Sequence, residues 1–463
     1  MAKSRDVHRC AECGATSPRW LGRCSRCEAW GTLEPVPAPA PDTPPGGRAP
    51  GTDGAEPVML DDVDVSASIP FSTGVGELDR VLGGGLVPGS VTLLGGEPGV
   101  GKSTLVLEVL GNAGTPGNPA LLQCGEESPA QVRGRAERLA VCTTNLMVLA
   151  DTDVHSVCAR AEAHDVALLA VDSIQTLRCA DSPGAPGTPA QVLACAQVLV
   201  EYAKRTGVAV VLVGHVTKDG DVAGPRALEH VVDTVLHFEG DRRHSLRMLR
   251  VRKHRFGGTD ELGCFEMRSG GLVALADPST RLLEGRPLGV PGSVAAAVLD
   301  GSRPLLVEAQ ALVAAPIGPP TRRSSGLDTT RVALVTAVLE KLEGVSAAGS
   351  DVFTTVTGGI SVNDPAFDLA LLMALASAVM EKPLDPRTVM VGEVGLAGEI
   401  RPVPRIEQRV REAVRHGFEA AVVPAPVPPE LALDPRLDGF ELIGVASIAE
   451  IVGVLTTTDL RAV

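Results

Sequence analysis

The sequence predicts an α/β protein whose largest domain is built on a parallel sheet. Three observations support this fold class. Short β-branched apolar runs alternate with helical stretches from residue 58 to about 286, one of these runs leads directly into a glycine-rich loop, and a second strand–helix region follows from residue 287. The 463 residues suit about three domains at roughly 150 residues each.

The expected strands of the first region are apolar throughout, which is typical of parallel strands covered by helices on both faces. They are residues 90–96, 120–125, 145–150, 166–172 and 208–215. The helices expected between them are residues 103–111, 128–140, 153–164 and 189–206. This order predicts right-handed crossovers. Residues 234–272 alternate in polarity, which indicates antiparallel strands at the edge of the same sheet.

The second α/β region is expected to span residues 287–463. Its expected elements are a strand hairpin (293–315), a helix (328–343), strands near 351–362, a helix (366–380), a strand pair (388–403), a helix (405–416) and a strand–helix pair (441–455). Before the first region lie a Cys-rich module, residues 1–33, and a Pro/Ala/Gly linker, residues 34–57, that cannot bury a core.

Composition excludes several classes of protein. A hydrophobic fraction of 44% and a charged fraction of 21% are typical of a folded chain and exclude wholesale disorder. The net charge of −14 excludes a polycation, so binding to nucleic acid would need a local basic patch. The longest nearly apolar run, residues 369–380, is too short for a bilayer, and the N-terminus lacks an apolar signal core. We therefore expect a soluble, cytoplasmic protein with no membrane partner.

The Cys-rich module has the spacing of a zinc site. Cys10 and Cys13 form one CxxC pair, and Cys24 and Cys27 form a second. Four thiolates can hold one tetrahedral Zn²⁺, and metal binding would supply the folding energy that so short a module lacks. Because four protein ligands leave no open position, the site is expected to be structural. The alternative is a set of redox-active or coincidental pairs.

The glycine-rich loop fits the pattern G-x4-G-K-[ST] between an expected strand and an expected helix. Its nucleotide-binding residues are Gly96, Glu97, Pro98, Gly99, Val100, Gly101, Lys102, Ser103 and Thr104. In such a loop the backbone N–H groups face the phosphates of ATP. Lys102 is expected to reach the β- and γ-phosphates, and the Ser103 hydroxyl is expected to ligate Mg²⁺.

Carboxylates follow two of the expected strands. Asp172 ends the apolar run 167–171 and is the expected second partner of Mg²⁺, which completes a Walker B element. Hydrolysis also needs a carboxylate that orients water near the γ-phosphate. Glu126 and Glu127 both follow the strand 120–125; we favour Glu126, because Glu127 can instead cap the following helix.

Two further polar segments carry alternatives. His215 ends the strand 208–215, where a polar side chain can sense the γ-phosphate and pass its state to the following loop; a satisfied core histidine is the other possibility. Residues 242–255 read RRHSLRMLRVRKHR, with no acidic residue. This run can contact DNA phosphates, enter the ATP site of a neighbouring subunit, or simply form a solvated strand face.

Together these motifs resemble the bacterial RadA (Sms) family of DNA repair ATPases, which are related to RecA. The likeness covers nearly the whole chain, including PRWLGRC (18–24), GEES (125–128), AVDSIQT (170–176) and GHVTKDG with AGPRALEHVVDTVLHFEGD (214–241). The Lys-Asn-Arg-Phe-Gly signature of the family is matched by Lys253, His254, Arg255, Phe256 and Gly257, with His in place of Asn.

The resemblance implies a RecA-type P-loop ATPase domain (58–286) behind an N-terminal zinc finger, assembled as a hexameric ring with ATP at the subunit interfaces. Lys253 and Arg255 would act in trans on the γ-phosphate of the neighbour, or on DNA. Two loops, 177–190 and 216–226, would line the channel of the ring. Lys218 and Arg226, both in the second loop, are the expected contacts to DNA phosphates.

The C-terminal region resembles the proteolytic domain of Lon, whose chemistry needs a Ser nucleophile and a Lys. Ala366 stands at the place of the nucleophile, the Lys position falls near Glu407, and no lysine follows Lys382. Without these groups no acyl-enzyme can form, so a non-catalytic scaffold is expected at 287–463.

The leading hypothesis is therefore a DNA-dependent, helicase-like ATPase in recombinational repair that binds single-stranded and branched DNA and drives branch migration. Its cofactors would be ATP, Mg²⁺ and Zn²⁺, and the family implies RecA as a partner. The alternatives are an ATP-dependent protease, which the missing lysine disfavours, and a zinc-finger adaptor that ATP merely switches.

Overall fold

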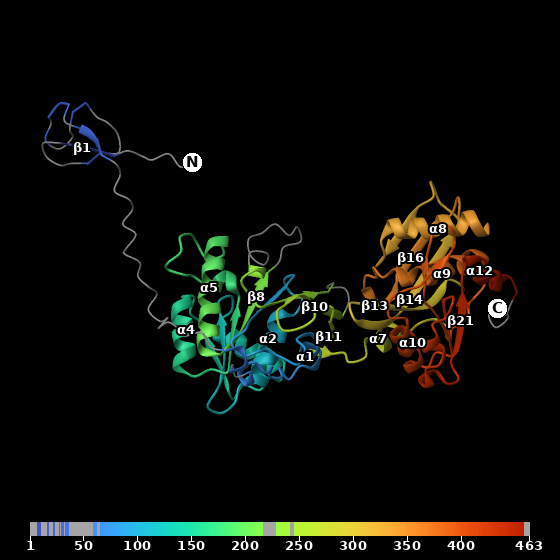
Figure 1. Cartoon of the computed structure of the whole chain (residues 1–463), viewed down its shortest axis with the longest axis horizontal. Coiled ribbons are helices and arrows are strands. Elements are labelled where there is room, and N and C mark those ends of the chain that lie inside the picture. Colours follow the sequence, from blue (N-terminus) through green and yellow to red (C-terminus); the bar gives the residue numbers. More distant parts are fainter. Residues whose placement is uncertain are drawn as a thin grey trace. The chain divides into compact units, whose positions relative to one another are not determined.

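A computed structural model describes residues 7–10, 16–17, 22–23, 27, 29–31, 33–36, 59–62, 65–215, 228–240 and 245–457. The chain forms two compact units, Met1–Asp64 and Val65–Val463 (Figure 1). In the described part of the first unit, a small antiparallel sheet has the order β2-β1-β3. Its strands are β1 (Val7–Cys10), β2 (Thr16–Ser17) and β3 (Leu33–Val36).

The first half of the second unit contains a large mixed sheet of order β12-β11-β10-β9-β4-β8-β7-β5-β6. Its strands are β4 (Val91–Gly96), β5 (Ala120–Cys124), β6 (Leu146–Leu149), β7 (Leu168–Asp172), β8 (Ala209–His215), β9 (Thr234–Glu239), β10 (Leu246–His254), β11 (Leu262–Arg268) and β12 (Gly271–Ala274). The strands from β9 to β6 in this order are parallel, and β10 to β12 add antiparallel pairs at one edge. Both features confirm the predicted fold class.

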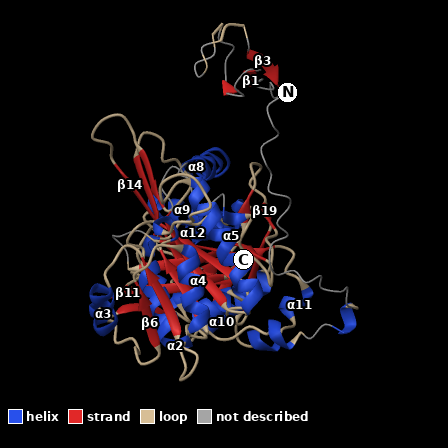
Figure 2. Cartoon of the chain, turned by 90° about the vertical axis from the view of Figure 1, so that its left-hand side faces the viewer, coloured by secondary structure: helices blue, strands red, loops and turns tan. Residues whose placement is uncertain are grey.

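Helices cover both faces of this sheet (Figures 1 and 2). They are α1 (Gly76–Val81), α2 (Lys102–Ala113), α3 (Pro129–Arg138), α4 (Val154–Ala163) and α5 (Pro189–Thr206). The short α7 (Pro278–Leu282) packs instead on the sheet of the second half of the unit. Alternate residues of β7 enter two different cores: Leu168 and Ala170 pack with the α2 side chains, whereas Leu169 and Val171 pack with those of α4 and α5. A strand that is buried on both faces must be apolar at every position, which explains the continuous run in the sequence.

The second half of the unit contains a further mixed sheet, of order β15-β16-β14-β13-β17-β20-β21. Its strands are β13 (Ser293–Asp300), β14 (Arg303–Ala314), β15 (Arg322–Ser325), β16 (Asp351–Val356), β17 (Thr388–Met390), β20 (Ala420–Pro424) and β21 (Glu441–Val445). Its helices are α8 (Thr329–Glu343), α9 (Asp368–Met380), α10 (Ile406–Arg415), α11 (Pro429–Ala432) and α12 (Ile448–Thr457). Helix α9 is buried on all sides from Asp368 to Ser377 and contributes residues 369–376 to the main hydrophobic cluster of this half.

The structure differs from the sequence-based expectation at several places in this half, which include the unexpected β15 and α11. Strands were expected near 351–362, but in this fully described stretch β16 ends at Val356, because Gly358 and Gly359 have positive φ and leave the extended conformation. In the expected pair 388–403, only β17 joins the large sheet, while β18 (Glu393–Val394) and β19 (Ile400–Arg401) pair with each other. The buried strand β20 was not expected, although its run AAVVP is apolar and ends at a proline.

One of the hydrophobic clusters extends across both halves of the second unit. Leu246 and Met248 of β10 pack in the same cluster as the side chains of α9 and β14. A buried ion pair also joins the halves, since Arg303 of β14 contacts Glu77 of α1. Glu77 is 3% exposed and accepts a further hydrogen bond from the backbone N–H of Cys264 at 2.8 Å. A buried carboxylate with several donors fixes the orientation of the two halves, because separating them would leave its charge unpaired.

Among the helices of the described residues, none is long and apolar enough to cross a membrane.

Candidate nucleotide-binding site

The glycine-rich loop connects the end of β4 to the first turn of α2, as the sequence predicts. Its path depends on glycine at two places. Gly96 has φ of 155°, and a Cβ atom there would lie 2.5 Å from the carbonyl oxygen of Phe238. Gly101 has φ of 121°, and its Cβ would lie 2.9 Å from Met267. The loop is thus held against β9 and β11, and the unpaired N–H groups of the α2 N-terminus form a cradle suited to phosphate.

Lys102 lies at the start of α2 and is 4% exposed. Its Nζ donates hydrogen bonds to the carbonyl oxygens of Gly96, at 2.8 Å, and Glu97, at 3.0 Å. Burial lowers the pKa of Lys102, while the carboxylates of Asp172 and Glu126 act in the opposite direction. The ammonium group of Lys102 thus contacts the loop and interacts electrostatically with Asp172 and Glu126, the two carboxylates predicted from the sequence.

Asp172 and Glu126 are brought together by the pairing of β5 with β7. Cys124 is the register partner of Asp172, and the N–H of Gly125 donates to the carbonyl oxygen of Asp172 at 2.9 Å. Glu126 therefore follows its strand at the level where β7 ends. The Ser173 hydroxyl donates to Glu126 Oε1 at 2.7 Å and holds this carboxylate in position. The carboxyl ends of parallel strands are where open α/β sheets bind ligands.

Glu127 has a different environment. It forms an ion pair with Arg135 of α3, on the helix that follows. It does not cap that helix, which corrects the alternative role considered for it. The N-cap is Ser128, which accepts from the N–H of Gln131, while the Gln131 side chain accepts from the N–H of Ser128. This capping box provides partners for backbone N–H groups at the start of α3, so Glu127 is not needed there and pairs with Arg135.

The donor set fits ATP with Mg²⁺. Ser103 and Thr104 occupy the first turn of α2, next to Lys102, and both are partly buried. A hydroxyl oxygen from Ser103 and a carboxylate from Asp172 are the oxygen ligands that Mg²⁺ prefers. Glycine at positions 96 and 101 lets the loop pack closely on its neighbours, since a side chain there would collide with Phe238 or Met267.

The basic run 242–255 does not act as one surface in its described part, residues 245–255. Arg247 is 5% exposed and donates from Nε to the carbonyl oxygen of Val100, within the phosphate-binding loop, at 3.2 Å. Arg250 instead pairs with Glu239 and Asp300. The interpretation as a solvated strand face is therefore wrong for Arg247. The sequence alone did not single out this arginine as a support of the loop.

Lys253 and Arg255 lie at the opposite end of the sheet from the loop. His254 pairs with Thr234, which in turn pairs with Thr92 near the start of β4. Four residues of extended strand, about 13 Å, separate Thr92 from Gly96 where the loop begins. Within one chain, the signature residues therefore lie near the amino end of β4, and the phosphate-binding loop follows its carboxyl end.

The contacts of the signature are specific. Lys253 Nζ donates to the carbonyl oxygens of Glu229, at 2.6 Å, and Val232, at 2.7 Å, and burial lowers its pKa. Arg255 lies 3.4 Å from Asp233.

The histidine of the signature is also held in place. His254 Nδ1 forms a hydrogen bond with the hydroxyl of Thr234 at 2.9 Å, and burial lowers the pKa of His254. The ring of Phe256 packs edge-on against that of His254, and Gly257 also lies close to the His254 ring.

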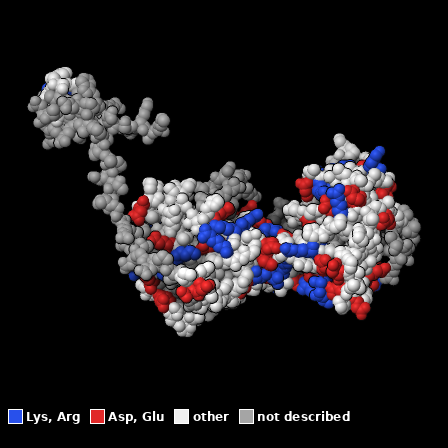
Figure 3. Space-filling model, viewed as in Figure 1, with Lys and Arg blue, Asp and Glu red and all other residues white. Residues whose placement is uncertain are grey.

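Several predicted residues lie outside the described part of the chain. These are Cys13, Cys24, Lys218, Arg226 and the side chain of His215. The predicted channel loop 177–190 is described and leads from the end of β7 into α5. In the view of Figure 3, Lys and Arg side chains form a band over the half of the second unit that carries this site.

Comparison with known proteins identifies the family. The chain is 47% identical to the DNA repair protein RadA of Mycobacterium tuberculosis (strain H37Rv) over 440 residues, which are 93% of this chain and 90% of the relative. It is 42% identical to the RadA protein of Bacillus subtilis (strain 168), over 97% and 98% of the two chains. It is 47% identical to that of Pseudomonas aeruginosa, over 92% and 94%. The chain belongs to the RadA family of DNA repair proteins.

Three family models match separate parts of the chain. An AAA domain matches residues 55–221, which contain the phosphate-binding loop, Glu126 and Asp172. A rubredoxin metal-binding domain matches residues 8–35, and the subunit ChlI of Mg-chelatase matches residues 355–426. The predicted architecture of a zinc ribbon, a RecA-type ATPase core and a Lon-like C-terminal domain is confirmed.

The described part of the zinc ribbon agrees with a shared metal site. Cys10, at the end of β1, is 1% exposed, and its Sγ lies 3.6 Å from that of Cys27. Two thiolates on one tetrahedral Zn²⁺ would be about 3.8 Å apart. One residue from each CxxC pair thus lies at a distance that a common ion requires.

Substitution of one ribbon ligand is expected to unfold the ribbon without affecting the ATPase core. Cys24→Ser removes one of the four thiolates, and metal binding is the main source of folding energy in so small a module. We expect the variant to lose its ribbon zinc and to become sensitive to proteolysis within residues 1–33. Binding of a fluorescent ATP analogue is expected to stay at the wild-type level, because the ribbon belongs to a separate unit. Loss of nucleotide binding would contradict this independence.

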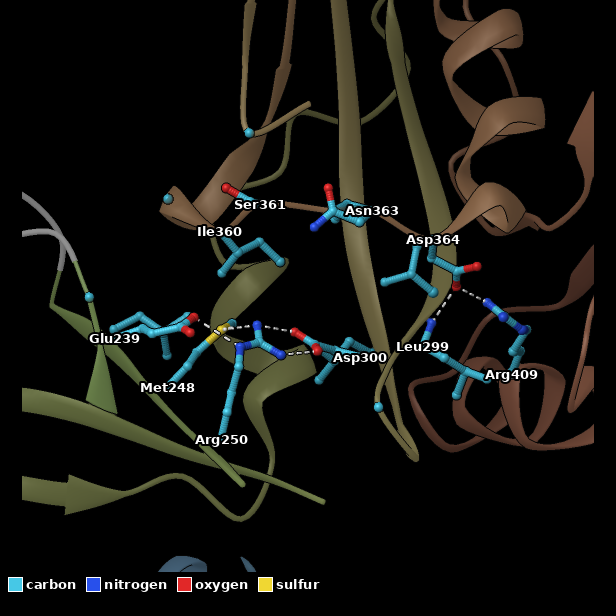
Figure 4. Close-up of a pocket in the computed structure, with 18 of the residues that line it drawn as sticks. Glu239, Met248, Arg250, Leu299, Asp300, Ile360, Ser361, Asn363, Asp364 and Arg409 are labelled. Carbon is cyan, nitrogen blue, oxygen red and sulfur yellow. Dashed lines mark hydrogen bonds and ion pairs between the residues drawn. The ribbon is translucent and has the colours of Figure 1, made fainter. Parts of the chain in front are cut away.

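A cavity of about 920 Å³ lies where the two halves of the second unit meet, between β10 of the ATPase half and β13 and β14 of the Lon-like half (Figure 4). At one end Arg250 bridges Glu239 and Asp300, and at the other Arg409 pairs with Asp364. Among the residues lining this cavity there is no lysine. Ala366 follows Asp364 closely and is fully buried, whereas Glu407 is partly exposed in the first turn of α10.

Proposed function

We propose that this chain is a DNA-dependent ATPase of recombinational repair, which uses ATP hydrolysis to move on single-stranded DNA and to drive branch migration. The observation that carries the proposal is the convergence of Lys102, Glu126 and Asp172 at the carboxyl edge of the sheet. These are the charges that phosphoryl transfer to water requires: a cation for the phosphates, a metal ligand and a carboxylate for the water.

Each residue has a defined part in this proposal. The loop N–H groups and Lys102 bind the phosphates, and Ser103 and Asp172 hold Mg²⁺, which supplies positive charge at the β- and γ-phosphates. Glu126, held by the hydrogen bond from Ser173, orients the attacking water and accepts its proton. Arg247 supports the loop through the carbonyl oxygen of Val100.

The site as proposed is completed by a neighbouring subunit in a hexameric ring. Lys253 and Arg255 lie at the other end of the strands from the phosphate-binding loop of their own chain. They therefore suit a role in trans on the nucleotide of the next subunit. Lys218 and Arg226 are proposed to contact DNA phosphates in the channel. The proposal also includes branched DNA and RecA as partners, and the cytoplasm as the location.

The Lon-like half is proposed to be a non-catalytic scaffold. A protease of this type needs a hydroxyl nucleophile beside a lysine. Ala366 offers no nucleophile, and no lysine follows Lys382 in the sequence. The buried pair of Arg409 with Asp364 instead stabilises this region. We therefore do not propose the ATP-dependent protease.

The proposed function is tested by measuring ATP hydrolysis of the purified chain with and without single-stranded DNA. We expect DNA to increase kcat and the increase to vanish in Lys102→Ala. Hydrolysis that is indifferent to DNA would contradict a DNA motor. It would favour instead the zinc-finger adaptor in which ATP acts as a switch.

The action of Arg255 in trans can be tested by mixing two inactive variants. Arg255→Ala and Lys102→Ala are each expected to lower hydrolysis by about 100-fold or more. In mixed rings, an interface that combines the intact Lys102 of one subunit with the intact Arg255 of the next would regain activity. Random mixing in equal amounts gives about one quarter of such interfaces, hence up to about one quarter of wild-type turnover. If Arg255 contacts only DNA, Arg255→Ala alone will retain its DNA-independent hydrolysis and mixing will change nothing.

A further inference from the structure

A cluster of three different metal-binding side chains lies on the ATPase half and includes none of the residues assigned to the nucleotide site. His155, Cys179 and Asp181 each offer one donor atom, and these atoms lie within 4.8 Å of one another. We propose that they form a second metal site, for Zn²⁺ or a cation of similar preference, separate from the four-cysteine ribbon.

The backbone brings the three residues together. His155 lies in the first turn of α4, and Cys179 and Asp181 lie in the segment after β7. The N–H of Arg178 donates to the carbonyl oxygen of Thr152 at 2.7 Å, and the N–H of Val154 donates to that of Arg178 at 3.0 Å. These two hydrogen bonds align the segment with the start of the helix.

Cys179 is further fixed by a buried glutamine. Gln191 of α5 is 1% exposed; its Oε1 accepts from the N–H of Cys179 at 2.8 Å, and its Nε2 donates to the carbonyl oxygen of Cys179 at 3.1 Å. With the backbone held on both sides, the thiol has a defined position before any ion binds. Preorganised donors of this kind lower the cost of metal binding.

The distances match those of a shared ion. His155 Nε2 lies 3.1 Å from Asp181 Oδ2 and 3.8 Å from Cys179 Sγ. Ligands on one tetrahedral Zn²⁺ would be separated by about 3.3 Å for nitrogen and oxygen and by about 3.6 Å for nitrogen and sulfur.

The same contacts exclude a nucleophilic relay. In a Cys–His–Asp relay, the acid binds one ring nitrogen of the histidine and the nucleophile approaches the other. Here the carboxylate and the thiol both approach Nε2. Three donors that converge on one point are the arrangement that a cation needs.

The donor types select the class of ion. A set of imidazole, thiolate and carboxylate suits Zn²⁺ better than Mg²⁺ or Ca²⁺, which prefer oxygen ligands. Cys179 is 3% exposed, whereas the side chains of His155 and Asp181 are 50% and 82% exposed, so a water molecule can take the fourth position. Binding would convert the thiol to a thiolate and release its proton to solvent.

A second cluster, Asp277, Glu412 and His416, is not a candidate metal site. Arg415 contacts Glu412 at 2.8 Å and Asp277 at 3.2 Å. Its guanidinium already supplies positive charge to both acids, so this cluster is an ion-pair network. The comparison singles out the cluster at His155 as the candidate metal site.

The consequence for the ATPase is mechanical. An ion at this site would tie the first turn of α4 to the segment between β7, which ends in Asp172, and α5. This segment includes the loop 177–190, so the ion would restrict its motion near the end that follows the Walker B strand.

The test uses the full-length chain with the ribbon site removed by Cys24→Ser and Cys27→Ser. After incubation with Zn²⁺ and dialysis, elemental analysis is expected to find about one zinc ion per chain in this background. Adding His155→Ala or Cys179→Ser is expected to remove it. The matched controls are His164→Ala and Cys142→Ser, which change exposed residues of the same two types. Absence of zinc from the background chain, or zinc retained in both site variants, would overturn the proposal.

A milder variant guards against effects of folding. Asp181 is largely exposed, so Asp181→Asn is expected to leave the structure intact. Loss of an outer-shell partner typically costs 10–100-fold in metal affinity, so loss of this direct ligand should weaken Zn²⁺ binding by about 100-fold in competition with a chelator. Unchanged affinity in Asp181→Asn would remove Asp181 from the site and contradict the three-residue arrangement.

Discussion

Lys102→Ala is expected to lower kcat for ATP hydrolysis by about 100- to 1,000-fold, the usual effect of removing one electrostatic stabiliser of the transition state. The ammonium group of Lys102 is buried beside the loop and within range of Asp172 and Glu126. In the substituted chain, no cation from this loop would face the γ-phosphate, and the two carboxylates would repel it. The measurement is steady-state phosphate release at saturating ATP, with far-UV circular dichroism to confirm the fold.

Lys341→Ala is the matched control for this substitution. Lys341 is exposed in the last turn of α8, in the Lon-like half, so its loss is expected to leave hydrolysis unchanged. A Lys102→Ala chain that hydrolyses ATP within tenfold of wild type would show that another residue supplies the essential charge. The assignment of the nucleotide site would then be wrong.

Glu126→Gln is expected to separate binding from turnover. The amide oxygen of glutamine can still accept the hydrogen bond from Ser173, so the side chain should keep its place. It can no longer accept a proton from the attacking water, and a general base typically contributes 10²–10⁴-fold. We therefore expect kcat to fall by about 100-fold or more while the Kd for ATP stays near that of wild type. Single-turnover hydrolysis and equilibrium binding measure the two quantities.

Glu127→Gln provides the comparison that decides between the two glutamates. It breaks a partly exposed ion pair with Arg135, and such pairs contribute only about 0–1 kcal/mol. We expect kcat within about twofold of wild type, since a 1 kcal/mol loss of stability leaves the native population almost unchanged. The reverse pattern, with Glu127→Gln inactive and Glu126→Gln active, would assign the catalytic carboxylate to Glu127.

Much of the fold could be read from local patterns because the ATPase sheet is buried on both faces. Continuous apolar runs such as 168–171 leave little choice of structure, and the strands fall within two residues of their predicted bounds. Strand β20 was not among the expected strands, although its run AAVVP is as continuously apolar as that of β7. The strand expected to continue past Val356 ends there, because the two glycines that follow adopt positive φ.

The sequence by itself determined the chemistry that depends on neighbours in the chain. The loop from Gly96 to Ser103, the spacing of the CxxC pairs and the absence of lysine after residue 382 are all local facts. The loop and each CxxC pair can be recognised from the sequence because their residues are close neighbours in the chain. The family resemblance rests on the same local motifs.

Only the tertiary structure decided what depends on pairing between distant strands. The register of β5 with β7 places Glu126 beside Asp172 and Ser173, while Glu127 is paired with Arg135 on α3. The pairing of β10 with β9 places Lys253 and its neighbours at the edge opposite the phosphate-binding loop. These positions result from strand order and register, which bring together residues tens of positions apart, and no local pattern records that order.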